Sequence, residues 1–217
     1  MKLKAVIFDL DGTLLNTVAD IASAMNSVLA NNNLPTHDEQ GYKYFVGKGL
    51  KSLVYNALPS HLRTAELLPQ YFEQLLAEYA KFMDEQTRPY PGIIDMLQQL
   101  QQKNIAMAIL SNKAHQFMND VVTTHFDNYN FSAVFGAREG VPSKPHPHSA
   151  LEIATIMKLP QQQIAFLGDS EVDMQTATSA NMYAIGAAWG FRTREELISS
   201  GAQTIISDPL ELVSLLG

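Results

Sequence analysis

The chain of 217 residues contains no cysteine. This absence excludes disulfide bonds, thiolate nucleophiles and cysteine–zinc sites, and it agrees with a reducing compartment. Basic side chains are also few, since 15 Lys and Arg face 22 Asp and Glu and leave a formal net charge of -7. A nucleic-acid surface needs clustered Lys and Arg, and no such block stands out. We therefore expect no nucleic-acid partner.

Long apolar runs are missing as well. The first run, residues 5–8, stops at Asp9, which is too short for the apolar region of a signal peptide, and no later run has the length of a membrane span. We therefore expect a cytoplasmic protein with no membrane partner. The apolar content of 46% is nevertheless too high for a disordered chain and is enough for a substantial core.

Short apolar runs alternate with helical patterns along most of the chain. This alternation predicts an α/β fold with a doubly wound parallel sheet. The expected strands are residues 5–8, 105–110, 131–135, 164–167, 182–186 and 203–206, and the expected helices between and after them are 93–102, 114–125, 149–157, 174–180, 193–199 and 209–216.

One stretch interrupts the alternation. Residues 16–84 show apolar positions at spacings of 3 and 4, as amphipathic helices do, and no strand pattern. We therefore expect an inserted all-helical domain at residues 16–84, within a core formed by residues 1–15 and 85–217.

Polar side chains follow several of the expected strands. Asp9 and Asp11 come after the first apolar run, Ser111 after the second and Asp169 after the fourth, while Lys144 lies in a loop that three prolines stiffen. Because the carboxyl ends of parallel strands share one edge of a sheet, these residues can meet there although they are distant in sequence.

The first of these clusters points to a metal. Asp9 and Asp11 are spaced so that both carboxylates can converge on one point, where they would repel each other. A hard divalent cation between them would relieve this repulsion. Taken alone, however, the stretch also fits a strand that ends in a solvated acidic turn.

The other candidates also have plain structural explanations when each is considered alone. Ser111 fits an ordinary helix N-cap, and Lys144 fits a surface lysine. Asp173 fits an acidic residue that a helix N-terminus favours. Lys48, which lies between two glycines, fits an exposed turn.

Together, the motifs come in the order found in one enzyme superfamily. The chain resembles the haloacid-dehalogenase-like phosphatases nearly end to end, and within them it looks most like a phosphoglycolate phosphatase. The resemblance implies a Rossmann-like catalytic core, with residues 16–84 as a helical cap. It rests on the stretches Asp9-Leu10-Asp11-Gly12-Thr13, Tyr90-Pro91-Gly92, Ser111-Asn112-Lys113, Lys144-Pro145, Gly168-Asp169-Ser170-Glu171-Val172-Asp173 and Trp189-Gly190-Phe191.

This resemblance implies a phosphomonoester hydrolase that works through an aspartyl-phosphate. Asp9 is then the nucleophile and Asp11 the general acid/base, and Ser111 and Lys144 complete the catalytic set. The implied cofactor is Mg²⁺, with Asp9, Asp11 and Asp169 as its ligands. Asp173 is expected to orient the neighbourhood of Asp169 or of Lys144.

The implied substrate is a small phosphorylated metabolite such as 2-phosphoglycolate, and the implied assembly is a monomer or a weak homodimer. Lys48 of the cap is a candidate to bind the substrate carboxylate. Asn112 is expected to offer its main-chain N–H at the start of a helix. The expected substrate or phosphate ligands are Leu10, Gly12, Thr13, Lys48, Ser111, Asn112 and Lys144.

Other functions stay open on the sequence alone. Asp11 argues against dehalogenases and phosphonate hydrolases, but a β-phosphoglucomutase, a nucleotidase or a pyrophosphatase would fit the same core. A receiver-type signalling domain also combines a phosphorylatable aspartate with Mg²⁺, a hydroxyl group and a lysine. Such domains are shorter and have no helical insertion.

Overall fold

The computed structural model describes residues 2–216. The chain divides into two compact units. One unit contains the chain up to Leu15 and again from Pro89 onward, and the other is Asn16–Arg88. The helical stretch expected at residues 16–84 lies within the second unit.

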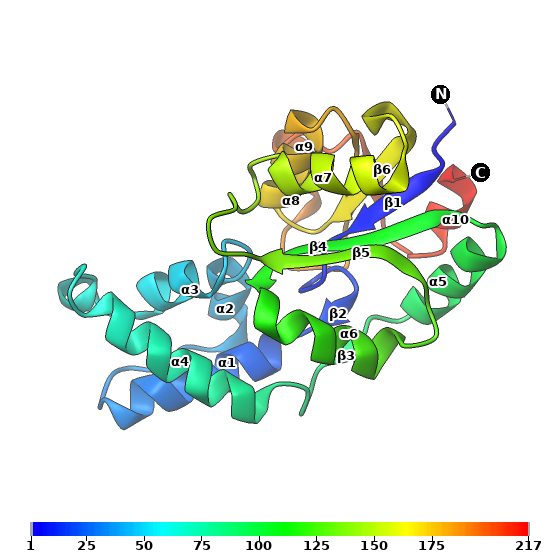
Figure 1. Ribbon diagram of the computed structural model, residues 1–217. Helices are drawn as coiled ribbons and strands as arrows, with labels where there is room; N and C mark the ends of the chain where they lie inside the picture. Colours follow the sequence, from blue (N-terminus) through cyan, green and yellow to red (C-terminus); the bar gives the residue numbers. More distant parts are fainter. Residues whose placement is uncertain (1, 217) are drawn as a thin grey trace. The chain divides into compact units, whose positions relative to one another are not determined.

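A six-stranded parallel sheet is the centre of the first unit (Figure 1). Its spatial order is β5-β4-β1-β6-β7-β8, so the chain winds away from β1 in one direction and then, from β6, in the other. The predicted doubly wound α/β fold is thereby confirmed, with the reversal between β1 and β6. The strands are β1 (Ala5–Phe8), β4 (Ala106–Ala114), β5 (Phe131–Ala137), β6 (Ile164–Gly168), β7 (Tyr183–Ala187) and β8 (Thr204–Ile206).

Helices cover both faces of this sheet (Figure 1). One face carries α5 (Ile93–Gln102), α6 (Met118–Phe126) and α10 (Glu211–Leu215), and the other carries α7 (His148–Met157), α8 (Glu171–Ser179) and α9 (Arg194–Ser199). Short 3-10 turns, η2 (His115–Phe117) and η3 (Gln161–Gln163), precede α6 and β6.

Strand β1 is buried along its whole length, as a central strand between two helical layers must be. Ala5 and Ile7 pack into the cluster that β6, α7 and α8 line, and alternation turns Val6 and Phe8 to the opposite face. This two-sided packing holds the end of β1 firmly in place, and Asp9 follows directly.

The second unit consists of α1 (Val18–Asn31), α2 (Glu39–Phe45), α3 (Leu50–Ala57) and α4 (Leu68–Phe82), with a 3-10 turn, η1 (Ser60–Leu62). Its core is made where α1 and α3 pack on α4. Asp20 in the first turn of α1 is buried and accepts hydrogen bonds from the main-chain N–H groups of Gln86 and Thr87, both at 2.9 Å. The returning end of the unit is thereby fastened to its first helix.

Three boundaries differ from the expected ones by three residues or more. Strand β4 does not end at Leu110 but continues to Ala114, which pairs with Ala137 of β5, and the following helix begins only at Met118. Helix α8 begins at Glu171 instead of Met174, because Ser170 and Asp173 form a capping box there. The two-residue strands β2 (Leu15–Asn16) and β3 (Arg88–Pro89), which form a small separate sheet, are too short to leave a periodic signal.

Within residues 2–216, no helix combines the length and the apolar character needed to cross a bilayer.

Candidate active site

Three aspartates meet where the sheet reverses its winding direction. Asp9 follows β1, Asp169 follows β6, and Asp173 lies in the first turn of α8. All three are buried, and one carboxylate oxygen of each lies within 4.8 Å of the others. Ligand sites of open α/β sheets form at this reversal, beyond the carboxyl ends of the strands.

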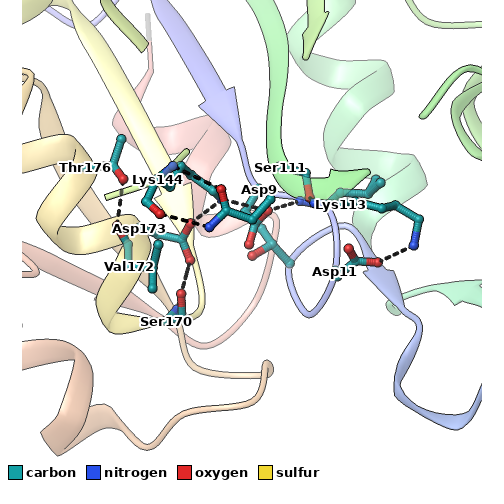
Figure 2. A network of polar contacts seen from close by, with 12 residues as sticks. Asp9, Asp11, Ser111, Lys113, Lys144, Ser170, Val172, Asp173 and Thr176 are labelled. Carbon is teal, nitrogen blue, oxygen red and sulfur yellow. Dashed lines mark hydrogen bonds and ion pairs between the residues drawn. The ribbon is translucent and has the colours of Figure 1, made fainter. Parts of the chain in front are cut away.

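Lys144 joins two of these carboxylates (Figure 2). Its Nζ lies 2.8 Å from Oδ1 of Asp9 and 2.6 Å from Oδ1 of Asp173, and its side chain is only 1% exposed. Burial lowers the pKa of Lys144, but the attraction of Asp173 and Asp9 outweighs it, so that the net pKa is raised. The ammonium group therefore stays charged between the two carboxylates.

The cluster has more negative than positive charge. Three carboxylates against the one ammonium of Lys144 leave a formal charge of -2. Burial first, and then repulsion by Asp173, raise the pKa of Asp9 well above its usual range and that of Asp169 to about 7. A divalent cation would balance this charge, and carboxylate oxygens are the ligands that hard cations prefer, so the cluster can hold a divalent metal ion.

Asp169 is held by its neighbours. Its Oδ1 accepts a hydrogen bond from Thr13 Oγ1 at 3.0 Å, and its Oδ2 accepts one from the main-chain N–H of Phe191 at 2.8 Å. A Cβ added at Gly12 or at Gly190 would collide with the Asp169 side chain. The two glycines therefore let the backbone close around this carboxylate, and Gly12 also has a positive φ of 92°.

The two carboxylate oxygens of Asp173 have different partners. Its Oδ2 accepts hydrogen bonds from Ser170, from Oγ at 2.6 Å and from the main-chain N–H at 3.1 Å, which caps α8. Its Oδ1 contacts Lys144. A side chain at Gly168 would occupy the place of Asp173. Helix capping and the contact with Lys144 thus come from one fixed carboxylate.

Asp11 lies outside the cluster of three (Figure 2, right). Its Oδ1 is 3.1 Å from Nζ of Lys113, whose side chain is 2% exposed, while that of Asp11 is 11% exposed. Lys113 was not a candidate from the sequence. It belongs to the Ser-Asn-Lys motif, and only the continuation of β4 puts it on the same face of the strand as Ser111. The main-chain N–H of Lys113 donates to Oγ of Ser111 at 3.1 Å.

Asn112 is placed differently from the expectation. It lies in β4 and not at the start of a helix, so the predicted helix-terminal N–H is wrong, because the strand pairs with β5 as far as Ala114. Its side chain instead forms hydrogen bonds with both main-chain polar groups of Lys144. Nδ2 of Asn112 donates to the carbonyl oxygen of Lys144, and Oδ1 of Asn112 accepts from the main-chain N–H of Lys144, each at 3.0 Å.

Two further expected ligands are found in distinct surroundings. The main-chain N–H of Leu10 donates to Oδ1 of Asp9 at 2.7 Å. Lys48 is exposed and belongs to the helical unit, between α2 and α3. The flanking Gly47 and Gly49 have positive φ angles of 118° and 82°, which only glycine adopts readily.

Comparisons with known proteins agree on the family of the chain. Residues 6–187 match the family model of the haloacid dehalogenase-like hydrolases. The phosphoglycolate phosphatase of Haemophilus influenzae (strain 86-028NP) is 27% identical over an alignment of 219 positions that covers 98% of each chain. That of Pseudomonas savastanoi pv. phaseolicola (strain 1448A / Race 6) is 29% identical over 214 residues, 97% of this chain and 78% of the relative.

Two solved structures are also similar to this chain in fold and in sequence. A crystal structure from Lactobacillus delbrueckii subsp. bulgaricus ATCC BAA-365 covers 100% of both chains with a TM-score of 0.93 and 29% identity. One from Haemophilus somnus 129pt, described as a predicted phosphoglycolate phosphatase, covers 99% of this chain and 98% of its own with a TM-score of 0.91 and 26% identity.

Proposed function

Because the chain belongs to the haloacid dehalogenase-like hydrolases and is a phosphatase, we propose that it hydrolyses 2-phosphoglycolate to glycolate and phosphate. We further propose that it needs Mg²⁺ and works through an aspartyl-phosphate on Asp9. One observation carries the mechanism: Asp9 lies at the end of β1, bonded to the Lys144 ammonium, in a buried cluster with two excess negative charges. The names of the relatives support the substrate.

In the first step, a carboxylate oxygen of Asp9 attacks phosphorus and the bond from phosphorus to the glycolate oxygen breaks. Asp11 enters this step protonated, as the second step leaves it, and gives its proton to the departing alkoxide. In the second step, Asp11 takes a proton from water, whose oxygen attacks phosphorus and releases phosphate from Asp9. The contact with Lys113 keeps Asp11 apart from the cluster of three aspartates, so that one carboxylate can attack while the other moves protons.

The remaining groups bind and balance charge. Lys144 neutralises the phosphate and the neighbouring carboxylates, and the Ser111 hydroxyl donates to a phosphate oxygen. Asp9 and Asp169 with their carboxylates, and Asp11 with its main-chain carbonyl, would hold Mg²⁺. When bound, the cation supplies charge neutralisation for the transferring phosphoryl group.

Lys48 is the proposed ligand for the substrate carboxylate. It is an exposed lysine in a segment whose two glycines permit close approach of the backbone to a ligand. A lysine ammonium and a carboxylate form a charge-assisted hydrogen bond, which would distinguish 2-phosphoglycolate from esters without an acid group.

A panel of phosphate esters tests the proposal. With Mg²⁺ present, kcat/KM should be highest for 2-phosphoglycolate, by about tenfold or more over ethyl phosphate, glucose 1-phosphate, nucleoside monophosphates and pyrophosphate. A better ester elsewhere in the panel would overturn the substrate and leave the chemistry in place. Failure to hydrolyse any ester of the panel would overturn the chemistry as well.

A further inference from the structure

The side chain of Asn112 satisfies both main-chain polar groups of one distant residue. Its Nδ2 donates to O of Lys144, and its Oδ1 accepts from N of Lys144, each at 3.0 Å. Both residues are buried, with 7% of Asn112 and 5% of Lys144 exposed. An amide side chain carries a donor and an acceptor side by side, so it can pair with a residue as a neighbouring strand would.

Within the segment that carries Lys144, main-chain hydrogen bonds close single turns, as from the N–H of His146 to O of Ser143 at 3.0 Å. Residues 138–147 belong to no helix or strand, so no ladder of main-chain hydrogen bonds holds them. Asn112, by contrast, lies in β4, between two positions, Leu110 and Ala114, that pair with β5. The Asn112 amide therefore fixes the backbone of Lys144 to a strand of the sheet.

The position of that backbone matters because of the other end of the side chain. Nζ of Lys144 lies 2.8 Å from Asp9 and 2.6 Å from Asp173, distances that a long and flexible side chain keeps only when its Cα is fixed. We propose that Asn112 is a positioning residue, which holds Lys144 so that its ammonium stays beside Asp9 and available to a phosphate. This inference rests on the proposed function, in which Lys144 neutralises the phosphate.

Similar pairs of hydrogen bonds elsewhere show that the arrangement alone is not a functional signal. Asn26 binds N and O of His37 at 3.1 and 2.8 Å, and Gln101 binds O of Asn128 and N of Asn130 at 3.2 and 2.9 Å. No residue of the acidic cluster is among these partners. What distinguishes Asn112 is that its partner contacts Asp9. Gln101→Ala, on α5 of the same unit, is therefore the matched control for the loss of two amide hydrogen bonds.

Asn112→Ala should lower kcat/KM by about 10- to 100-fold, and Asn112→Ser by less, because a hydroxyl can still accept from the Lys144 N–H. The loss should be equal on 2-phosphoglycolate and on ethyl phosphate, since Lys144 faces the phosphate that both esters share. Gln101→Ala should stay within about twofold of the wild type. If Asn112→Ala does not fold, Asn112→Ser takes its place in every comparison.

A double-mutant cycle with Lys144→Ala tests whether Asn112 acts through Lys144. The double variant Asn112→Ala/Lys144→Ala should be no slower than Lys144→Ala alone, within about twofold. Losses that multiply would overturn the inference, as would wild-type activity of Asn112→Ala while Lys144→Ala is impaired. Unchanged activity of Lys144→Ala itself would instead overturn the role of Lys144 in the proposed function.

Discussion

Two buried lysines contact the two aspartates of the first motif, and their surroundings differ. Lys144 is shared by Asp9 and Asp173 within a cluster of three carboxylates. Lys113 contacts Asp11, which lies outside that cluster. The first group keeps a formal charge of -2, whereas the contact between Lys113 and Asp11 joins one ammonium to one carboxyl group.

The difference bears on the separate roles that we propose for these two aspartates, which are only two positions apart. A buried group with excess negative charge attracts a cation and then a phosphate, which suits the carboxylate that attacks. Asp11 lies outside that group, and its side chain is 11% exposed, so water can reach its carboxylate. These surroundings agree with the proposed roles of Asp9 in nucleophilic attack and of Asp11 in proton transfer.

Removal of the metal should have the largest effect on turnover, because the charged cluster at Asp9 would then lack the cation that neutralises it. Exhaustive dialysis against EDTA should lower turnover by about a thousandfold or more, and Mg²⁺ should restore it. Ca²⁺, whose coordination is larger and less regular, should bind without restoring turnover. Full activity in EDTA would show that the excess charge at Asp9 does not serve a metal.

Replacement of each lysine by methionine should distinguish the two groups by stability. Removal of one partner from a buried ion pair costs about 3–5 kcal/mol, and Lys144→Met should approach this loss at pH 8. The loss should shrink at pH 5.5, where the carboxylates can protonate, and Mg²⁺ should recover part of it. Lys113→Met should lose less, because Asp11 is partly hydrated, and Mg²⁺ should recover little.

Urea denaturation of the wild type and of both variants, with and without Mg²⁺ at pH 8 and at pH 5.5, gives the free energies of unfolding that this comparison needs. Equal losses with equal recovery by Mg²⁺ would mean that the two lysine groups are not electrostatically distinct.

Lys48 tests whether a third lysine serves recognition instead of charge balance. Lys48→Ala should lower kcat/KM for 2-phosphoglycolate. The fall should correspond to a loss of about 1–3 kcal/mol in transition-state stabilisation, the range for a hydrogen bond to a charged group. Ethyl phosphate, which has no carboxylate, is the control and should be hydrolysed almost as before. Equal losses on both esters would assign Lys48 to the phosphate or to the folding of the helical unit.

The smallest effect expected is a change in metal stabilisation with pH. A carboxyl group with a raised folded-state pKa contributes stability below its unfolded pKa and loses it as pH rises through the folded value, which is about 7 for Asp169. The metal-free protein should therefore lose stability at this site between about pH 4 and 8. Mg²⁺ favours the ionised carboxylates, so its stabilisation should be about 1 kcal/mol larger at pH 8 than at pH 5.5. Thermal unfolding in both buffers measures it, and a stabilisation independent of pH would contradict the charge assignment.

The sequence was sufficient to predict the fold class, because strand and helix patterns alternate along it. It also predicted the end of β1, because the apolar run stops at a carboxylate. It was insufficient at β4, where Ser111, Asn112 and Lys113 are polar and were expected to leave the strand. Their partners Asp11 and Lys144 are distant in sequence, so tertiary contacts override the local preference. The Asp11–Lys113 pair and the Asn112 amide contacts could not be predicted for the same reason.

The most direct test of the different roles of Asp9 and Asp11 is a rapid-quench experiment on Asp11→Asn. With p-nitrophenyl phosphate, the weakly basic phenoxide can leave without a proton, so Asp9 should still be phosphorylated, while hydrolysis of the aspartyl-phosphate lacks its base. We expect a burst of p-nitrophenol close to one per active site, a slow steady rate after it, and almost no turnover of 2-phosphoglycolate. Loss of both substrates to the same extent, without a burst, would contradict it.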